Sequence, residues 1–65
     1  MTRVEIRIIE VGSLECTVAV GSETYEDVYV PYAKLRAGQR FEATMFRNGN
    51  GHVRFAQWRA VGNCG

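Results

Sequence analysis

The chain has 65 residues, 46% of them hydrophobic, and its 8 Lys and Arg side chains nearly balance 7 Asp and Glu side chains. This length allows a single domain. A domain of this size buries only about 60% of the surface of its unfolded chain, which favours an efficient closed architecture. A net charge of +1 attracts a polyanion weakly at long range, so any nucleic-acid binding has to rest on local clusters of basic residues.

The sequence shows no sign of a membrane or a secreted protein. Its apolar runs are far shorter than the about 20 residues of a transmembrane helix. The first residues alternate like a strand and lack the apolar stretch of a signal peptide, so we expect a cytoplasmic protein. Cys16 lies in an apolar strand pattern and Cys64 near the C-terminus. The reducing cytoplasm favours two free thiols, and a disulfide between Cys16 and Cys64 is the alternative.

Residue patterns that carry catalysis are missing from the sequence. One histidine and two distant cysteines do not form a metal site. There is no glycine-rich phosphate loop and no nucleophile with a base at a recognisable spacing. We therefore expect a protein that is not an enzyme and that needs no cofactor and no metal.

The first 20 residues contain two runs of alternating apolar and polar side chains. Residues 3–11 predict a strand that Gly12-Ser13 ends. Residues 14–20 predict a second strand, joined to the first by a tight turn. The expected core-facing side chains of both strands are Val4, Ile6, Ile8, Leu14, Cys16, Val18 and Val20.

A third strand is predicted over residues 25–31, after the turn Gly21-Ser22-Glu23-Thr24. In this strand Val28 and Val30 face the core, and Tyr29 faces outward. Pro31 cannot donate a hydrogen bond to a neighbouring strand, so the strand ends or lies at an edge there. Residues 32–37 then predict a short helical turn that Gly38 stops.

The last part of the chain predicts a hairpin around Asn48–Gly51, because Asn-Gly suits the positive φ angles of a tight turn. Before the turn, residues 39–47 alternate with Phe41, Ala43 and Met45 inward. After it, the core face of residues 52–61 is ambiguous, because both faces carry large apolar groups. Trp58 either fills the core, as is usual for a lone tryptophan, or marks a contact surface. Residues 62–65 predict a frayed tail.

These elements predict an all-β domain over residues 1–61. Short strands at regular spacing, with no long helix, are typical of a small antiparallel barrel. Closing the sheet into a barrel also removes the edges that so small a chain can hardly protect. The fold expected from the residues is a five-stranded barrel with one helical turn after the third strand.

The middle of the chain resembles a cold-shock domain. The segment Asp27-Val28-Tyr29-Val30, then Tyr32 and a turn ending at Leu35, then Gly38-Gln39-Arg40-Phe41-Glu42, has the order and spacing of that family. The likeness covers about residues 14–61 and is best over 27–42. It implies an OB-type barrel that binds single-stranded RNA or DNA, and an SH3-like barrel is the alternative closure.

The first two strands depart from the family, which carries base-stacking aromatics there. This chain has Ile6-Arg7-Ile8-Ile9 and Cys16-Thr17-Val18-Ala19-Val20 in their place, and Pro31 where the family has histidine. Only Tyr29 and Tyr32 carry over as candidate stackers. Because stacking contributes about 1–3 kcal/mol per base, the expected binding is weak.

The candidate residues for nucleic acid are two tyrosines and five basic side chains. Tyr29 has two alternative roles, stacking on a base or pairing with an aromatic ring on a neighbouring strand. The junction position of Tyr32 favours packing over one end of the barrel. The basic candidates are Arg7, Lys34, Arg47, His52 and Arg54.

Two hypotheses of function follow from these residues. The first is a cold-shock-like OB barrel that binds single-stranded nucleic acid weakly through Tyr29 and Tyr32, with the five basic candidates on phosphates, three of them at the hairpin. The alternative for those basic residues is a solvated turn. The second hypothesis is a protein-interaction or dimerisation module, in which the outward apolar residues Ile9 and Phe46 form the contact.

Overall fold

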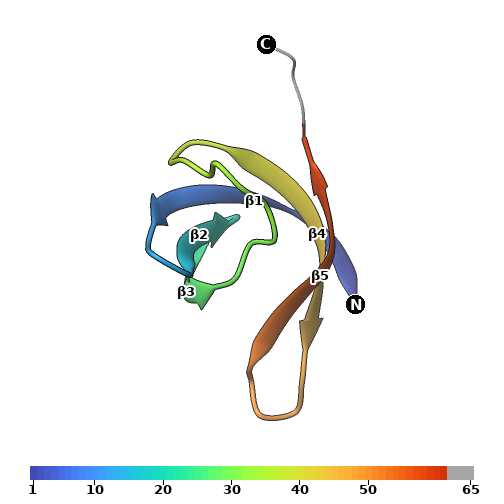
Figure 1. The fold of residues 1–65 in the computed structure, drawn as a ribbon. Coiled ribbons are helices and arrows are strands. Elements are labelled where there is room, and N and C mark those ends of the chain that lie inside the picture. The colour runs from blue at the N-terminus through green and yellow to red at the C-terminus, as the bar shows by residue number, and fades with distance from the viewer. Residues whose placement is uncertain (62–65) are drawn as a thin grey trace.

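The computed structural model describes residues 1–61, so the predicted tail and Cys64 lie outside the described residues. Its five strands are β1 (Thr2–Val11), β2 (Cys16–Val20), β3 (Glu23–Val28), β4 (Arg40–Arg47) and β5 (Val53–Ala60). They form one antiparallel sheet in the order β3-β2-β1-β4-β5 (Figure 1). The all-β prediction is confirmed, and β3 and β5 are the two edges of the sheet.

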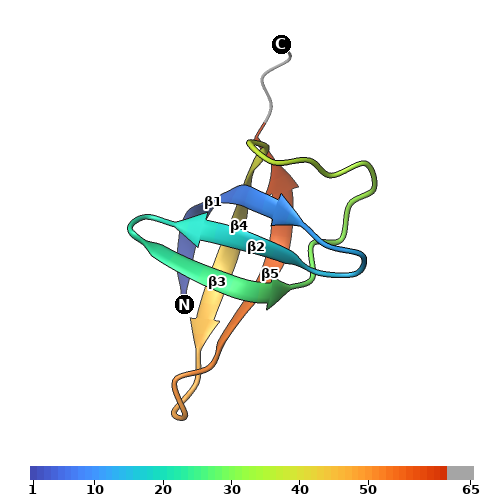
Figure 2. The same ribbon diagram turned by 90° about the vertical axis from the view of Figure 1, so that its left-hand side faces the viewer.

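Strand β1 is long enough to pair with two strands, β4 along its first part and β2 along its second. Its first part pairs with β4, from Thr2 opposite Met45 to Arg7 opposite Arg40. Its second part pairs with β2, and the register shifts between Ile8 and Glu10. Such a bulge bends a strand. As a result β1, β2 and β3 lie across β4 and β5, and the sheet curls until its two edges face each other (Figure 2).

The closed barrel predicted from the sequence is wrong. Within residues 1–61, no Cα atom of β3 lies within 8 Å of a Cα atom of β5. Each edge strand contains a bulge, at Asp27 with a φ of 58° and at Gln57 with a φ of 55°. Bulges twist an edge and interrupt its pairing, so the two edges stay apart.

The helical turn predicted for residues 32–37 is also wrong, because this segment is an irregular loop in the structure. Lys34 has a φ of 59°, a left-handed conformation that an α-helical turn does not accept. The loop is tied to the sheet instead. The Gly38 amide donates to the Ile8 carbonyl at 2.8 Å, and the Ile8 amide donates to the Gln39 carbonyl at 2.9 Å.

The core forms on the inner side of the curled sheet. Most of the inward positions predicted for β1, β2 and β4 are confirmed, but Leu14 is wrong because it is 80% exposed in the loop before β2. That loop is closed by a hydrogen bond from the Gly12 amide to the Glu15 carbonyl. The buried apolar side chains are Ile6, Ile8, Cys16, Val18, Val30, Phe41 and Ala43. Residues 1–61 contain no helix of the length and hydrophobicity that crossing a membrane requires.

The bulge in β5 resolves the ambiguous core face of that strand. The register slips between Glu42 and Thr44, opposite Gln57. An extra residue reverses the alternation, because side-chain direction repeats every two residues. Phe55, before the bulge, and Trp58, after it, therefore both pack against the core.

Candidate functional site

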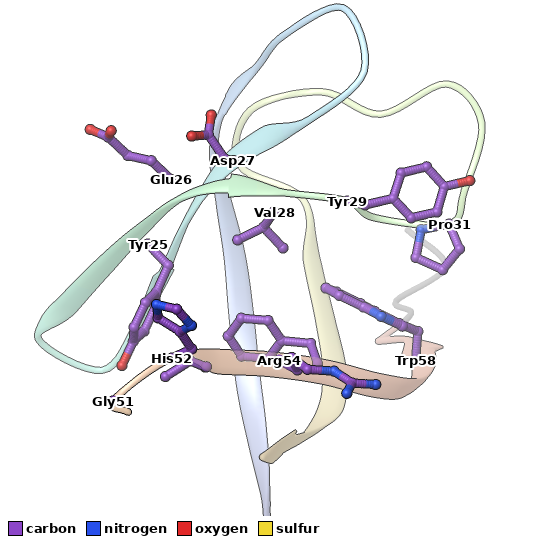
Figure 3. Close-up of a pocket in the computed structure, with 12 residues that line it drawn as sticks. Tyr25, Glu26, Asp27, Val28, Tyr29, Pro31, Gly51, His52, Arg54 and Trp58 are labelled. Atoms are coloured by element: carbon purple, nitrogen blue, oxygen red, sulfur yellow. The ribbon is translucent and has the colours of Figure 1, made fainter. Parts of the chain in front are cut away.

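A groove of about 620 Å³ occupies the gap between the two sheet edges. One wall is β3 with Tyr29 and Pro31, and the other is β5 with the end of the preceding hairpin loop. Tyr29, Pro31 and Trp58 lie at one end of the groove, and Tyr25 and His52 lie at the other (Figure 3). The groove is therefore a direct consequence of the open sheet.

Aromatic rings form a continuous surface inside the groove. Tyr25 and Phe55 meet edge to face with ring centroids 5.8 Å apart, and Phe55 and Trp58 follow at 5.9 Å. Trp58 also contacts the buried Phe41 at 6.1 Å. Edge-to-face and offset contacts are the preferred geometries of such rings. The groove surface is thus held by the core and is largely formed before any ligand arrives.

Tyr25 enters the groove because of the bulge at Asp27, which places Tyr25 and Val28 on the same side of β3. Its hydroxyl donates to Glu23 Oε1 at 2.8 Å. This bond raises the pKa of the Tyr25 phenol, because ionisation would lose the bond and set two anions side by side. The Arg47 guanidinium lowers the same pKa, because a positive charge favours the ionised phenol, but the net direction is upward.

Charge is divided unequally between the two rims of the groove. All seven acidic residues of the chain lie at or before Glu42, whereas residues 43–61 carry Arg47, His52, Arg54 and Arg59 and no carboxylate. On the β3 rim, Glu26 and Asp27 are among the residues that line the groove, with their carboxylates turned away from β5 (Figure 3). On the β5 rim, His52 and Arg54 line it. Residues 43–61 of the β4–β5 hairpin therefore form a cationic arm beside an aromatic groove.

Arg3 holds the bulge that turns Trp58 into the groove. Its guanidinium donates to the Gln57 carbonyl at 2.7 Å and to Thr44 Oγ1 at 3.1 Å. Thr44, which is buried, donates in turn to Gln57 Oε1 at 2.9 Å. Glu42 lies 3.5 Å from the same guanidinium. Arg3 thus connects β1 to β5 across β4 and stabilises the left-handed conformation of Gln57.

Replacing Arg3 by methionine should lower the free energy of unfolding by about 1–2 kcal/mol, because two charge-assisted hydrogen bonds are lost from a partly exposed site. The release of Gln57 should also shift the fluorescence of Trp58 to longer wavelength as its ring meets more water. Arg7→Met is the control, since Arg7 is an exposed residue of the same strand. Equal effects of the two substitutions, measured by urea unfolding and emission spectra, would contradict this role of Arg3.

The structure brings together only part of the predicted site. Tyr29, His52 and Arg54 line the groove, and Arg47 lies beside Tyr25. The other predicted residues lie elsewhere. Tyr32 stacks on Phe41 with centroids 4.8 Å apart, Lys34 lies in the loop after β3, and Arg7 borders a separate hollow near β2.

Several residues that line the groove were not identified as site residues from the sequence. They are Tyr25, Pro31, Phe55 and Trp58. For Trp58 the only signal was the ambiguous core face of its strand. Nothing in the sequence indicated Tyr25, because strict alternation with Val28 and Val30 predicts that its side chain faces outward. The predicted apolar patch of Ile9 and Phe46 does not form. The pairing of Thr2 with Met45 places Phe46 opposite Met1, and Met1 and Ile9 are about 26 Å apart along an extended chain.

No family model, curated protein or solved structure matches this chain. Among residues 1–61, no three His, Cys, Asp or Glu side chains are grouped to hold a metal ion. The function therefore has to be inferred from the groove and its charges.

Proposed function

We propose that this protein binds single-stranded nucleic acid in the groove between β3 and β5. The observation that carries the proposal is the meeting of an aromatic groove with the part of the hairpin after Glu42, residues 43–61, which bears three arginines and no carboxylate. Proteins that bind single strands combine these two features, with rings for the bases and basic side chains for the backbone. The curled open sheet suits a partly open OB architecture, which the resemblance to cold-shock domains implies.

The arrangement of side chains assigns a role to each rim. Tyr29 is 68% exposed and lies at the same end of the groove as Trp58, so a base entering there has a ring on either side. Arg54 and His52 line the β5 rim, which supports a role for them as phosphate contacts. Glu26 and Asp27 disfavour the backbone on the β3 rim by charge repulsion. The bases therefore lie toward β3 and the backbone along β5.

Titration with a short oligonucleotide of RNA or DNA tests the proposal directly. Trp58 is the single tryptophan of the chain, so its fluorescence reports on the groove alone. Binding should quench this fluorescence and weaken steeply as salt rises, because phosphate contacts release counterions. For a single strand, each contact contributes about −0.7 to the slope of log affinity against log salt.

Arg54→Gln should weaken binding and reduce that slope by about 0.7, the contribution of one phosphate contact. Arg7→Gln is the matched control, because Arg7 lies outside the groove and should change neither quantity. Unchanged Trp58 fluorescence at low salt with both RNA and DNA would rule out the proposed function.

A further inference from the structure

The β4–β5 hairpin has a second hollow on its other face. In an antiparallel pair, directly opposed residues project from the same face and successive residues from opposite faces. Phe55 packs with the groove aromatics, so Phe46 and its partner Arg54 start from the opposite face of the strand pair, and Arg54 at the sheet edge borders both this face and the groove. A hollow of about 330 Å³ lies there, lined by Phe46, Arg47, Asn48, His52 and Arg54.

The second hollow and the groove share two residues, His52 and Arg54. These basic side chains therefore stand on the β5 edge between the two depressions. The hairpin turn beside them is closed by its own hydrogen bonds. Asn48 Oδ1 accepts from the Asn50 amide at 2.9 Å and from the His52 amide at 3.1 Å. The edge that separates the two depressions is thus a fixed feature of the hairpin.

Phe46 is an aromatic ring on the surface of this cationic arm. It is 37% exposed, and its cross-strand neighbour is Arg54. A partly exposed ring beside an arginine offers a base both a stacking face and a nearby charge for its phosphate. A strand that left the groove over β3 instead would pass the carboxylates of Glu26 and Asp27.

We propose that the bound strand leaves the groove over the β5 edge and stacks a further base on Phe46, with His52 and Arg54 contacting phosphates at the crossing. This inference rests on the proposed function and extends its site to both faces of the hairpin. The direction follows from charge, since residues 43–61 carry no carboxylate that would repel the backbone. The ligand class is a single strand longer than the groove itself.

Oligonucleotides of two lengths test the extended site on the intact chain. A strand of about 4 nucleotides should fill the groove alone, and one of about 8 should also reach Phe46. We expect the longer strand to bind about tenfold more tightly, as measured by Trp58 quenching. Phe46→Ala should abolish this gain and leave the affinity for the short strand unchanged. Phe46→Leu keeps apolar bulk without the aromatic ring and should also lose most of the gain.

The outcomes separate this inference from the proposed function. If neither length quenches Trp58, the proposed function itself fails. If the short strand binds but the longer one gains nothing, or if Phe46→Ala weakens both lengths equally, the extended site is overturned while the groove stands. Self-association of the wild-type protein in sedimentation, lost in Phe46→Ala, would assign Phe46 to a second copy of the chain and would also overturn it.

Discussion

Replacing Phe41 by alanine should unfold this domain at room temperature or shift its unfolding transition strongly. Phe41 is 1% exposed and belongs to the largest fully buried side chains. It faces Ile6 of β1 and Ala60 of β5, and its ring contacts Tyr32 and Trp58. The substitution therefore removes contacts from both halves of the curled sheet and from the loop after β3.

The energies decide the outcome of this substitution. Truncating a buried phenylalanine to alanine costs about 3–5 kcal/mol. Stability of about 0.05–0.15 kcal/mol per residue gives a domain of this length about 3–10 kcal/mol in total. The loss is therefore comparable to the whole free energy of unfolding.

Phe46→Ala is the matched control, because it makes the same chemical change in the same strand at a side chain that is 37% exposed. Circular dichroism and Trp58 fluorescence during urea unfolding should show a native fold for Phe46→Ala and a lost or strongly shifted transition for Phe41→Ala. Similar stabilities for the two variants would mean that Phe41 does not anchor the core.

Hydrophobic alternation predicted the fold wherever a strand keeps its register. Ile6 and Ile8 in β1, and Phe41 and Ala43 in β4, are buried as the pattern indicates. The hairpin at Asn48–Gly51 was also predictable, because the local chemistry of asparagine and glycine decides it. These features depend on residues close together in the sequence.

The groove was not predictable, because it depends on two bulges without a sequence signal. Asp27 and Gln57 adopt left-handed conformations that glycine usually occupies. Each bulge reverses the alternation of an edge strand and turns Tyr25 or Trp58 inward. The same bulges keep the edges apart, so the error about barrel closure and the missed site residues have one physical cause.

Tyr29 and Tyr32 show how far residue type alone can mislead. Both are outward tyrosines in the resemblance to cold-shock domains, yet the structure gives them different surroundings. Tyr29 is 68% exposed at the groove, whereas Tyr32 is 38% exposed and stacks on Phe41 at an angle of 23°. A stacked aromatic pair contributes about 0.5–1.5 kcal/mol beyond the area it buries. One tyrosine is thus available to a ligand, and the other is committed to the fold.

Alanine substitutions should separate these two roles. Tyr29→Ala should reduce oligonucleotide affinity about 5- to 150-fold, the equivalent of one stacked base, and change the free energy of unfolding by less than about 0.5 kcal/mol. Tyr32→Ala should lower the free energy of unfolding by about 1–2 kcal/mol and leave the affinity of the folded protein unchanged. Trp58 quenching measures the affinity, and urea unfolding measures the stability. The reverse pattern would place the ligand over the loop after β3 instead of in the groove, because Tyr32 lies in that loop and is 38% exposed.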